Sequence, residues 1–135
     1  MSLTLADAKK LIAGAEATAV AMERNVSIVV VDSRAVPLMM QRMDGAFWGT
    51  PGIATAKART SVDMNADSGS LAGLKADLPG VWSLIESQVA YPITSLGGGL
   101  VIHVDGQVVG AIAVSGASED EDIAIATAGI AAWQS

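Results

Sequence analysis

The sequence predicts an α/β fold of the α+β type, with a mainly antiparallel sheet packed against helices. Helical and strand patterns follow the order helix-strand-strand-helix, two short helices, and strand-strand-helix. Short turns separate the strands of each pair, which indicates hairpins because parallel strands need long crossover connections. The length of 135 residues fits one hydrophobic core, so residues 1–135 are expected to form a single domain.

A helix and a buried strand are predicted first. Thr4 can cap the helix, with Asp7 at the position that Glu or Gln usually takes in a capping box. Apolar residues at helical spacing continue to about Arg24: Leu5, Ala8, Leu11, Ile12, Ala15, Ala19 and Met22. The run S-I-V-V-V-D, residues 27–32, is typical of a central strand.

A second strand and an irregular middle region follow. The segment P-L-M-M-Q-R-M at residues 37–43 is expected to be a strand that D-G-A ends. Thr50 followed by Pro51 marks a helix start, and the helix continues to about Met64. L-A-G-L-K-A-D-L and V-W-S-L-I-E-S predict two short helices broken by P-G, and a short strand is expected after residues 91–92.

The last elements are a hairpin and a helix. Leu100–Val104 and Gln107–Ser115 carry strand patterns, and the D-G dipeptide between them is a strong signal for a two-residue turn. Ser118 and Glu121 have capping-box spacing and predict a helix to about Trp133.

The composition limits the classes of function. Hydrophobic residues make up 51% of this small chain, which predicts contact with other copies in a homo-oligomer. A net charge of −6 with scattered Lys and Arg argues against nucleic-acid binding. The absence of cysteine excludes disulfides, thiolate nucleophiles and Cys-bound metals. No signal peptide or membrane-spanning run is recognisable, so a cytoplasmic location without membrane contact is expected.

Three successive glycines, Gly97, Gly98 and Gly99, precede the only histidine of the chain. A phosphate loop is not expected, because a strand follows the glycines where a helix N-terminus would be required. Two interpretations stay open: the backbone passes close to another element, or the missing side chains leave room for a ligand. Strand alternation places His103 on the strand face opposite Leu100, Ile102 and Val104. A surface position rather than a role in binding is expected for it, as the family resemblance given below implies.

Charged residues offer further candidates. Lys57 interrupts a helix of small residues, so its ammonium group either reaches solvent or meets an anion. Arg42 and Asp44 can pair with each other or with Lys57, which would be a structural explanation. The acidic run at residues 119–122 fits helix capping better than a metal site, and no metal site is predicted. Asp122 stays a candidate for a further role.

Six segments carry a family resemblance. They are V-V-V-D (29–32), Q-R-M-D-G-A (41–46), I-A-T-A-K-A-R-T (53–60), G-G-G (97–99), D-G-Q-V-V-G-A-I-A-V-S-G-A (105–117) and Asp122 before an alanine-rich helix. In this order they cover nearly the whole chain, which resembles the family of small haem-associated proteins that includes GlcG, HbpS and the C-terminal domain of PduO.

The resemblance implies a profilin-like fold, in which a five-stranded, mainly antiparallel sheet lies between helices. It also implies a homo-oligomer such as a tetramer or octamer, and haem or another tetrapyrrole as the ligand. Three features depart from the family. The turn after Asp32 is S-R-A-V-P where the family is usually glycine-rich. Val101 stands where the family often has proline, and residues 1–24 lack the first-helix histidine that is associated with haem in the PduO domain. The cluster M-M-Q-R-M favours core packing over axial haem ligation.

The leading hypothesis is a small-molecule-binding protein with a pocket between the sheet and the loops at residues 47–51 and 91–99. The expected ligand-binding residues are Arg42, Met43, Phe47, Trp48, Lys57, Tyr91, Gly97, Gly98 and Gly99. The alternative is an isomerase, tautomerase, decarboxylase or hydratase that acts on a small carboxylate or carbonyl compound by proton transfer. Its candidate catalytic residues are Lys57, Asp32, Asp122 and Tyr91. Burial of Lys57 against a carboxylate beside a pocket would favour this alternative, and the absence of a pocket would favour a purely structural subunit.

Overall fold

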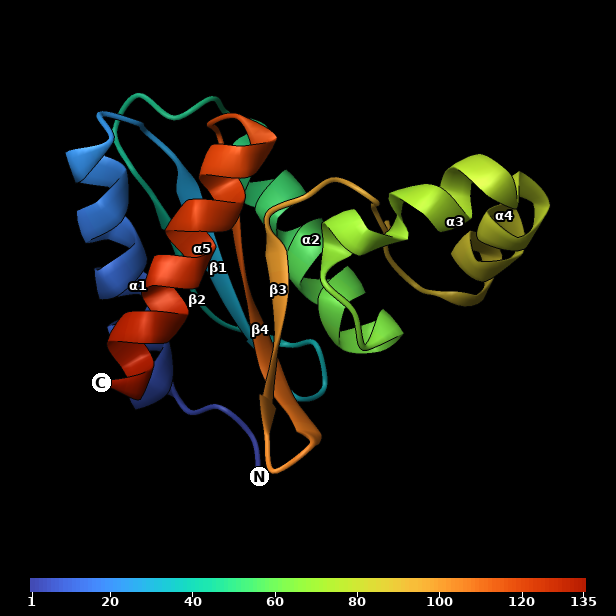
Figure 1. Ribbon diagram of the computed structural model, residues 1–135, viewed down its shortest axis with the longest axis horizontal. Helices are drawn as coiled ribbons and strands as arrows, with labels where there is room; N and C mark the ends of the chain where they lie inside the picture. Colours follow the sequence, from blue (N-terminus) through green and yellow to red (C-terminus); the bar gives the residue numbers. More distant parts are fainter.

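The computed structural model describes residues 1–135 and contains one four-stranded sheet with helices on both faces (Figure 1). The elements in chain order are α1 (Leu5–Ala21), β1 (Ser27–Asp32), β2 (Pro37–Arg42), α2 (Thr50–Met64), the 3-10 helix η1 (Ser68–Leu71), α3 (Ala72–Asp77), α4 (Pro79–Gln88), β3 (Gly99–Val104), β4 (Gln107–Ser115) and α5 (Glu119–Gln134). The strand order is β2-β1-β4-β3 and every pairing is antiparallel. The predicted α+β fold with an antiparallel sheet is confirmed.

The expected fifth strand is wrong. Residues 93–98, the region of the predicted short strand, form no sheet ladder and instead bond to helices on either side. Thr94 N donates to Thr60 Oγ1 at 3.1 Å, and Gly97 N donates to Glu119 Oε1 at 2.7 Å. Because side chains of α2 and α5 satisfy these amides, the segment has no need of a strand partner.

Local signals place the helix starts and the hairpin turn. Thr4 and Ser118 both form complete capping boxes, and Asp7 closes the first one as Glu would. Asp105 and Gly106 both have positive φ, 51° and 77°, as a two-residue hairpin turn requires. The first helix ends at Ala21, three residues before the expected end, because Glu23 takes a left-handed conformation with φ of 58°.

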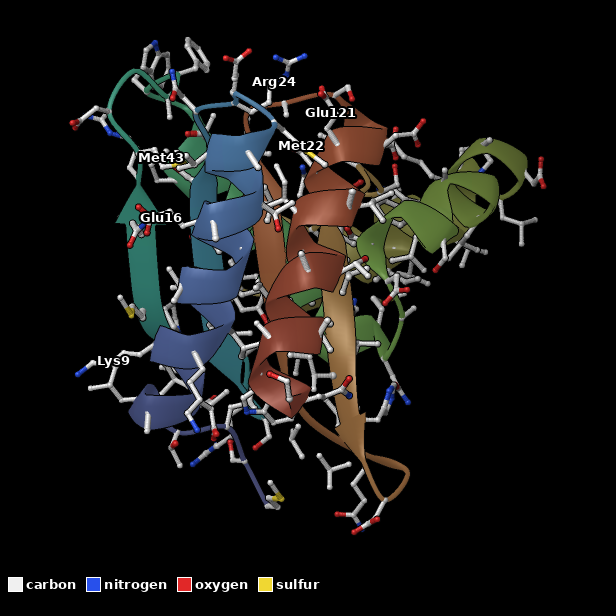
Figure 2. All side chains as sticks on the ribbon, turned by 60° about the vertical axis from the view of Figure 1, so that its left-hand side comes forward. Lys9, Glu16, Met22, Arg24, Met43 and Glu121 are labelled. Atoms are coloured by element: carbon white, nitrogen blue, oxygen red, sulfur yellow. The ribbon has the colours of Figure 1, made fainter.

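Two cores lie on opposite faces of the sheet. The larger one is formed under α1 and α5, which lie side by side and are joined at one end by the Arg24–Glu121 ion pair of 3.0 Å (Figure 2). The smaller one, under α2, consists of Val29, Val31, Ala54, Ala58, Ala111 and Ala113. Alanine at the contact lets α2 approach the sheet closely, so polar side chains of α2 beyond this core reach the end of β4.

The remaining helices form a lobe, defined here as η1, α3 and α4, that extends away from the sheet (Figure 1). Leu71 and Trp82 of the lobe form a separate buried cluster with Ile93, which follows α4 in the chain. No helix in the structure combines the length and the apolar character needed to cross a membrane.

Candidate functional site

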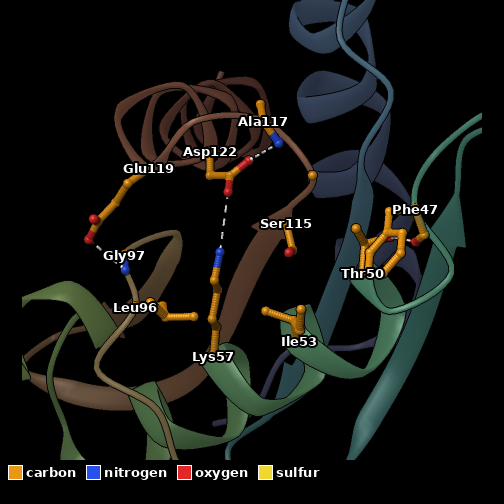
Figure 3. A pocket seen from close by; sticks show the side chains of 11 residues that line it. Phe47, Thr50, Ile53, Lys57, Leu96, Gly97, Ser115, Ala117, Glu119 and Asp122 are labelled. Carbon is orange, nitrogen blue, oxygen red and sulfur yellow. Dashed lines mark hydrogen bonds and ion pairs between the residues drawn. The ribbon is translucent and has the colours of Figure 1, made fainter.

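A pocket of about 360 Å³ lies where β4 ends, between α2 and the first turn of α5 (Figure 3). Its lining residues are Phe47, Thr50, Ile53, Lys57, Leu96, Gly97, Ser115, Gly116, Ala117, Glu119 and Asp122. The start of α2 is fixed at this end of the sheet by the buried hydrogen bond of 2.8 Å between the hydroxyl groups of Ser27 and Thr50. Ser27 lies opposite Ser115 in the sheet register, so the pocket sits where β1 begins and β4 ends.

Lys57 and Asp122 form a buried ion pair at the pocket. Lys57 Nζ lies 3.3 Å from Asp122 Oδ2 and donates to the carbonyl oxygen of Val114 at 2.8 Å. The other carboxylate oxygen, Asp122 Oδ1, accepts from Ala117 N at 3.0 Å. Each of the two residues is only 3% exposed, and between them they join α2, β4 and α5. Lys57 therefore pairs with a carboxylate of the protein itself. The partner is Asp122, whereas the sequence suggested Asp44 or an anionic ligand.

Burial moves the pKa values of the pair towards each other. Loss of hydration lowers the pKa of Lys57, and the charges of Asp122 and Glu119 only partly oppose this. Loss of hydration also raises the pKa of Asp122, against the opposing effect of Lys57. Both shifts reduce the free-energy cost of passing a proton from the ammonium group to the carboxylate. The pair can therefore exchange a proton more readily than an exposed Lys–Asp pair.

The three glycines pass close to the charged residues of the pocket. A β-carbon on Gly98 would lie 2.5 Å from Val114 O and 2.8 Å from Lys57 Nζ, and one on Gly97 would overlap Glu119. The amide of Gly97 is bonded to Glu119, and that of Gly99 donates to Ser68 Oγ at 3.0 Å. Both interpretations therefore apply, since the backbone of the glycines passes close to α2 and α5 and Gly97 also lines the pocket.

The rim of the pocket is apolar and exposed. Phe47, Ile53 and Leu96 line it, and the ring of Trp48 packs at a tilt against that of Phe47, with centroids 5.0 Å apart. Phe47 is 58% exposed and Leu96 54%, so both present carbon surface to whatever enters. Sequence reasoning missed Ile53 and Leu96. Ile53 could have been found, because it lies four residues before Lys57 on the same helix face.

Asp32 and His103 lie away from the pocket. Asp32 is at the far end of β1, and its Oδ1 accepts from Arg34 N and Val36 N, which closes the turn into β2. His103 is exposed, and its Nε2 lies 2.6 Å from Asn65 Oδ1 on the surface.

Tyr91 and Arg42 border two other hollows. Tyr91 bonds to the carboxylate of Asp63 and lies under the guanidinium of Arg59, 4.6 Å from the ring centroid, beside a hollow of about 250 Å³. Arg42 and Met43 lie in a third hollow near Glu16. The predicted site residues are thus divided among three hollows. Of these residues, only Phe47, Lys57, Gly97 and Asp122 line the pocket at the end of β4.

The acidic run of α5 caps its helix, as expected, and two of its members also serve the pocket. Glu121 completes the capping box, while Glu119 and Asp122 turn towards the glycines and Lys57 (Figure 3). No group of three or more potential metal-ligating His, Asp or Glu side chains occurs in the structure.

Comparison with known proteins identifies a matching family model and several related sequences. Residues 3–131 match the family model described as haem degrading protein HbpS-like. An uncharacterised 15.0 kDa protein from the dhaT-dhaS intergenic region of Citrobacter freundii is 38% identical over 125 residues, covering 90% of this chain and 84% of that protein. The chain spans 39% of the length of the PduO corrinoid adenosyltransferases that it also matches.

Solved structures are similar over almost the whole chain. The crystal structure of a PduOC:heme complex superposes with a TM-score of 0.88 at 28% identity, covering 98% of this chain and 95% of that one. A double mutant of Streptomyces reticuli HbpS superposes with a TM-score of 0.86 at 34% identity, covering 97% of this chain and 86% of that one.

Proposed function

Because the chain belongs to the HbpS-like family, we propose that it is a small-molecule-binding protein whose ligand occupies the pocket beside Lys57 and Asp122. The observation that carries this proposal is a buried lysine that lines an open pocket with an apolar rim. A volume of about 360 Å³ is at the lower end of the range for ligand pockets, roughly 300–1,000 Å³. The ligand is therefore a small metabolite.

The charges in the pocket limit the chemistry of the ligand. Lys57 carries one positive charge, while Asp122 and Glu119 carry two negative charges, so the lining has a net charge of −1. Arg42, one of the expected ligand-binding residues, borders a different hollow and cannot add its positive charge to this pocket. A neutral compound with an oxygen that accepts from Lys57 and a short carbon chain against Ile53 fits better than a dicarboxylate.

Haem is the ligand that the relatives suggest, and a haem site needs a side chain that can bind the iron. Haem iron in proteins is commonly held by His, Cys, Met or Tyr, and none of these lines the pocket. His103 is bonded to Asn65, and Met43 borders another hollow. The pocket therefore does not fit an axially ligated haem. Titration with hemin is expected to give the Soret band of free hemin, and a distinct band abolished by Lys57→Met would overturn this choice of ligand.

Ligand binding is tested by recording amide spectra of the isotope-labelled protein with small aldehydes, ketones and monocarboxylates. We expect shifts confined to Gly97, Gly116 and Ala117, which line the pocket. Shifts that instead gather around Arg59 and Tyr91, or no shifts with any compound, would contradict the proposal.

A second candidate is an enzyme that moves protons on a carbonyl compound. The burial of Lys57 beside Asp122, with both pKa values shifted towards proton exchange, favours it. Incubation of the protein with acetone or pyruvate in D₂O would show loss of the proton signals next to the carbonyl. The rate should fall to that of buffer in Lys57→Met, and an equal rate in this variant would exclude Lys57 as the base.

A further inference from the structure

Lys57 differs from the other three lysines of the chain in its surroundings. Lys9, Lys10 and Lys75 are not buried, whereas Lys57 is 3% exposed and lines the pocket. Two acceptors account for two of its three N–H groups: Val114 O at 2.8 Å and Asp122 Oδ2 at 3.3 Å. Loss of hydration makes a buried lysine easier to convert to the neutral, nucleophilic amine than a solvated one, and the carboxylate beside it can accept the proton although its charge opposes the change.

We propose that Lys57 is a carbonyl-reactive lysine, which forms a reversible imine with a small aldehyde or ketone bound in this pocket. The inference rests on the proposed function, because it uses the same pocket and the same class of ligand. It goes further by assigning a covalent step to one nitrogen atom. The net charge of −1 favours neutral aldehydes and ketones over keto acids, and Ile53 and Leu96 provide apolar contacts for a short chain.

The chemistry balances with the groups present. A proton passes from Lys57 Nζ to Asp122 Oδ2, and the neutral amine then attacks the carbonyl carbon to form a C–N bond. The carbonyl oxygen takes up a proton from the nitrogen to give a carbinolamine, which loses one water as the C=N bond forms. Asp122 returns its proton to the imine nitrogen. The sum converts an ammonium ion and a carbonyl compound into a protonated imine and water.

Two neighbours position this nitrogen. Val114 O holds Nζ at the end of β4, and Ala117 N fixes the Asp122 carboxylate through its other oxygen. Asp122 can therefore accept the proton without leaving its place. Glu119 adds negative charge nearby and favours the protonated imine that results.

Reductive trapping tests the proposal. The protein is incubated with butanal and sodium cyanoborohydride at pH 7, digested, and analysed by mass spectrometry for a butyl group on each lysine. Lys57 should be labelled faster than Lys10, because burial lowers the pKa of Lys57 and so raises its neutral fraction, and because the pocket holds butanal beside it. Pyruvate should label Lys57 more slowly than butanal does. Labelling of the surface lysines with none at Lys57 would overturn the proposal.

Variants make the assignment specific. Lys57→Arg should abolish the fast labelling, and Lys10→Arg, the matched surface control, should leave it unchanged. If Lys57→Arg does not fold, the ratio of Lys57 to Lys10 labelling in the unaltered chain decides the outcome alone.

Failure of this inference can be told apart from failure of the proposed function. Shifts of the Gly97 and Ala117 amides with butanal, without trapping at Lys57, would leave binding in place and refute the imine. Neither shifts nor trapping with any carbonyl compound would contradict both.

Discussion

Gly98 passes so close to Lys57 that a β-carbon at residue 98 would lie 2.8 Å from Nζ. The same β-carbon would lie 2.5 Å from Val114 O, which is the acceptor that holds the lysine. The absence of a side chain at this glycine is therefore what allows the lysine, the strand end and the loop to meet in one place.

Gly98→Ala should destabilise the protein by about 2–4 kcal/mol, from backbone strain at a φ of +123° and from overpacking against Val114. Gly80→Ala is the matched control, because a β-carbon at residue 80 would meet nothing within 4 Å and the φ of Gly80 lies outside the left-handed region. Urea unfolding of both variants provides the measurement. Equal stability of the two would show that the loop can move away from Lys57.

Lys57→Met should destabilise the protein by about 3–5 kcal/mol near neutral pH, because the Asp122 carboxylate stays buried without its partner. Burial already raises the pKa of Asp122, and loss of Lys57 raises it further. The folded state then binds a proton more tightly than the unfolded state, so the stability of the variant falls as pH rises through this raised value. Unfolding curves should show the largest difference from the unaltered chain at neutral pH and a smaller one in acid.

Trp133→Phe should weaken the contact between α1 and α5. Trp133 Nε1 donates to Asp7 Oδ1 at 3.0 Å, and this bond is the main cause that lowers the pKa of Asp7. The stabilisation is present above the ordinary pKa of the carboxyl and is lost as pH falls through the lowered one. We expect a loss of about 1 kcal/mol at pH 7 that disappears in acid. Trp48→Phe, which alters an exposed ring, should change neither the stability nor its pH dependence.

Phe47→Ala should weaken binding of butanal by up to about tenfold, which corresponds to about 1.4 kcal/mol of lost apolar contact at the rim. Stability should hardly change, because the ring is 58% exposed. Leu84→Ala on α4 removes a similarly exposed side chain that does not line the pocket, so it should leave binding unchanged. Amide shifts of Gly97 during titration measure the affinity, and an equal loss in both variants would argue against a specific rim.

The parts of the fold that depend on neighbouring residues could be predicted from the sequence. The capping boxes at Thr4 and Ser118 and the turn at Asp105 involve residues at most three positions apart, so their patterns are visible in the chain. The segment at residues 93–98 could not be assigned, because its amides bond to Thr60 and to Glu119, far away in sequence.

The same distinction applies to the candidate site. The sequence marks Lys57 and Asp122 as separate candidates, but their contact joins residues 65 positions apart and depends on how α2 and α5 pack at the end of β4. No spacing rule relates two helices on opposite faces of a sheet. For the same reason Tyr91 and Arg42, which sequence reasoning places with Lys57, border separate hollows in the structure.

The lobe of η1, α3 and α4 shares none of its buried residues with either core of the sheet. Its link to the pocket is Ser68, which accepts from Gly99 N and donates to Leu96 O. Substitutions around Trp82 should therefore combine additively with substitutions under α1. In evolutionary terms the chain separates two kinds of constraint: the surroundings of Lys57 must be kept as a set, whereas the lobe beyond Ser68 can diverge without matching changes in the two cores of the sheet.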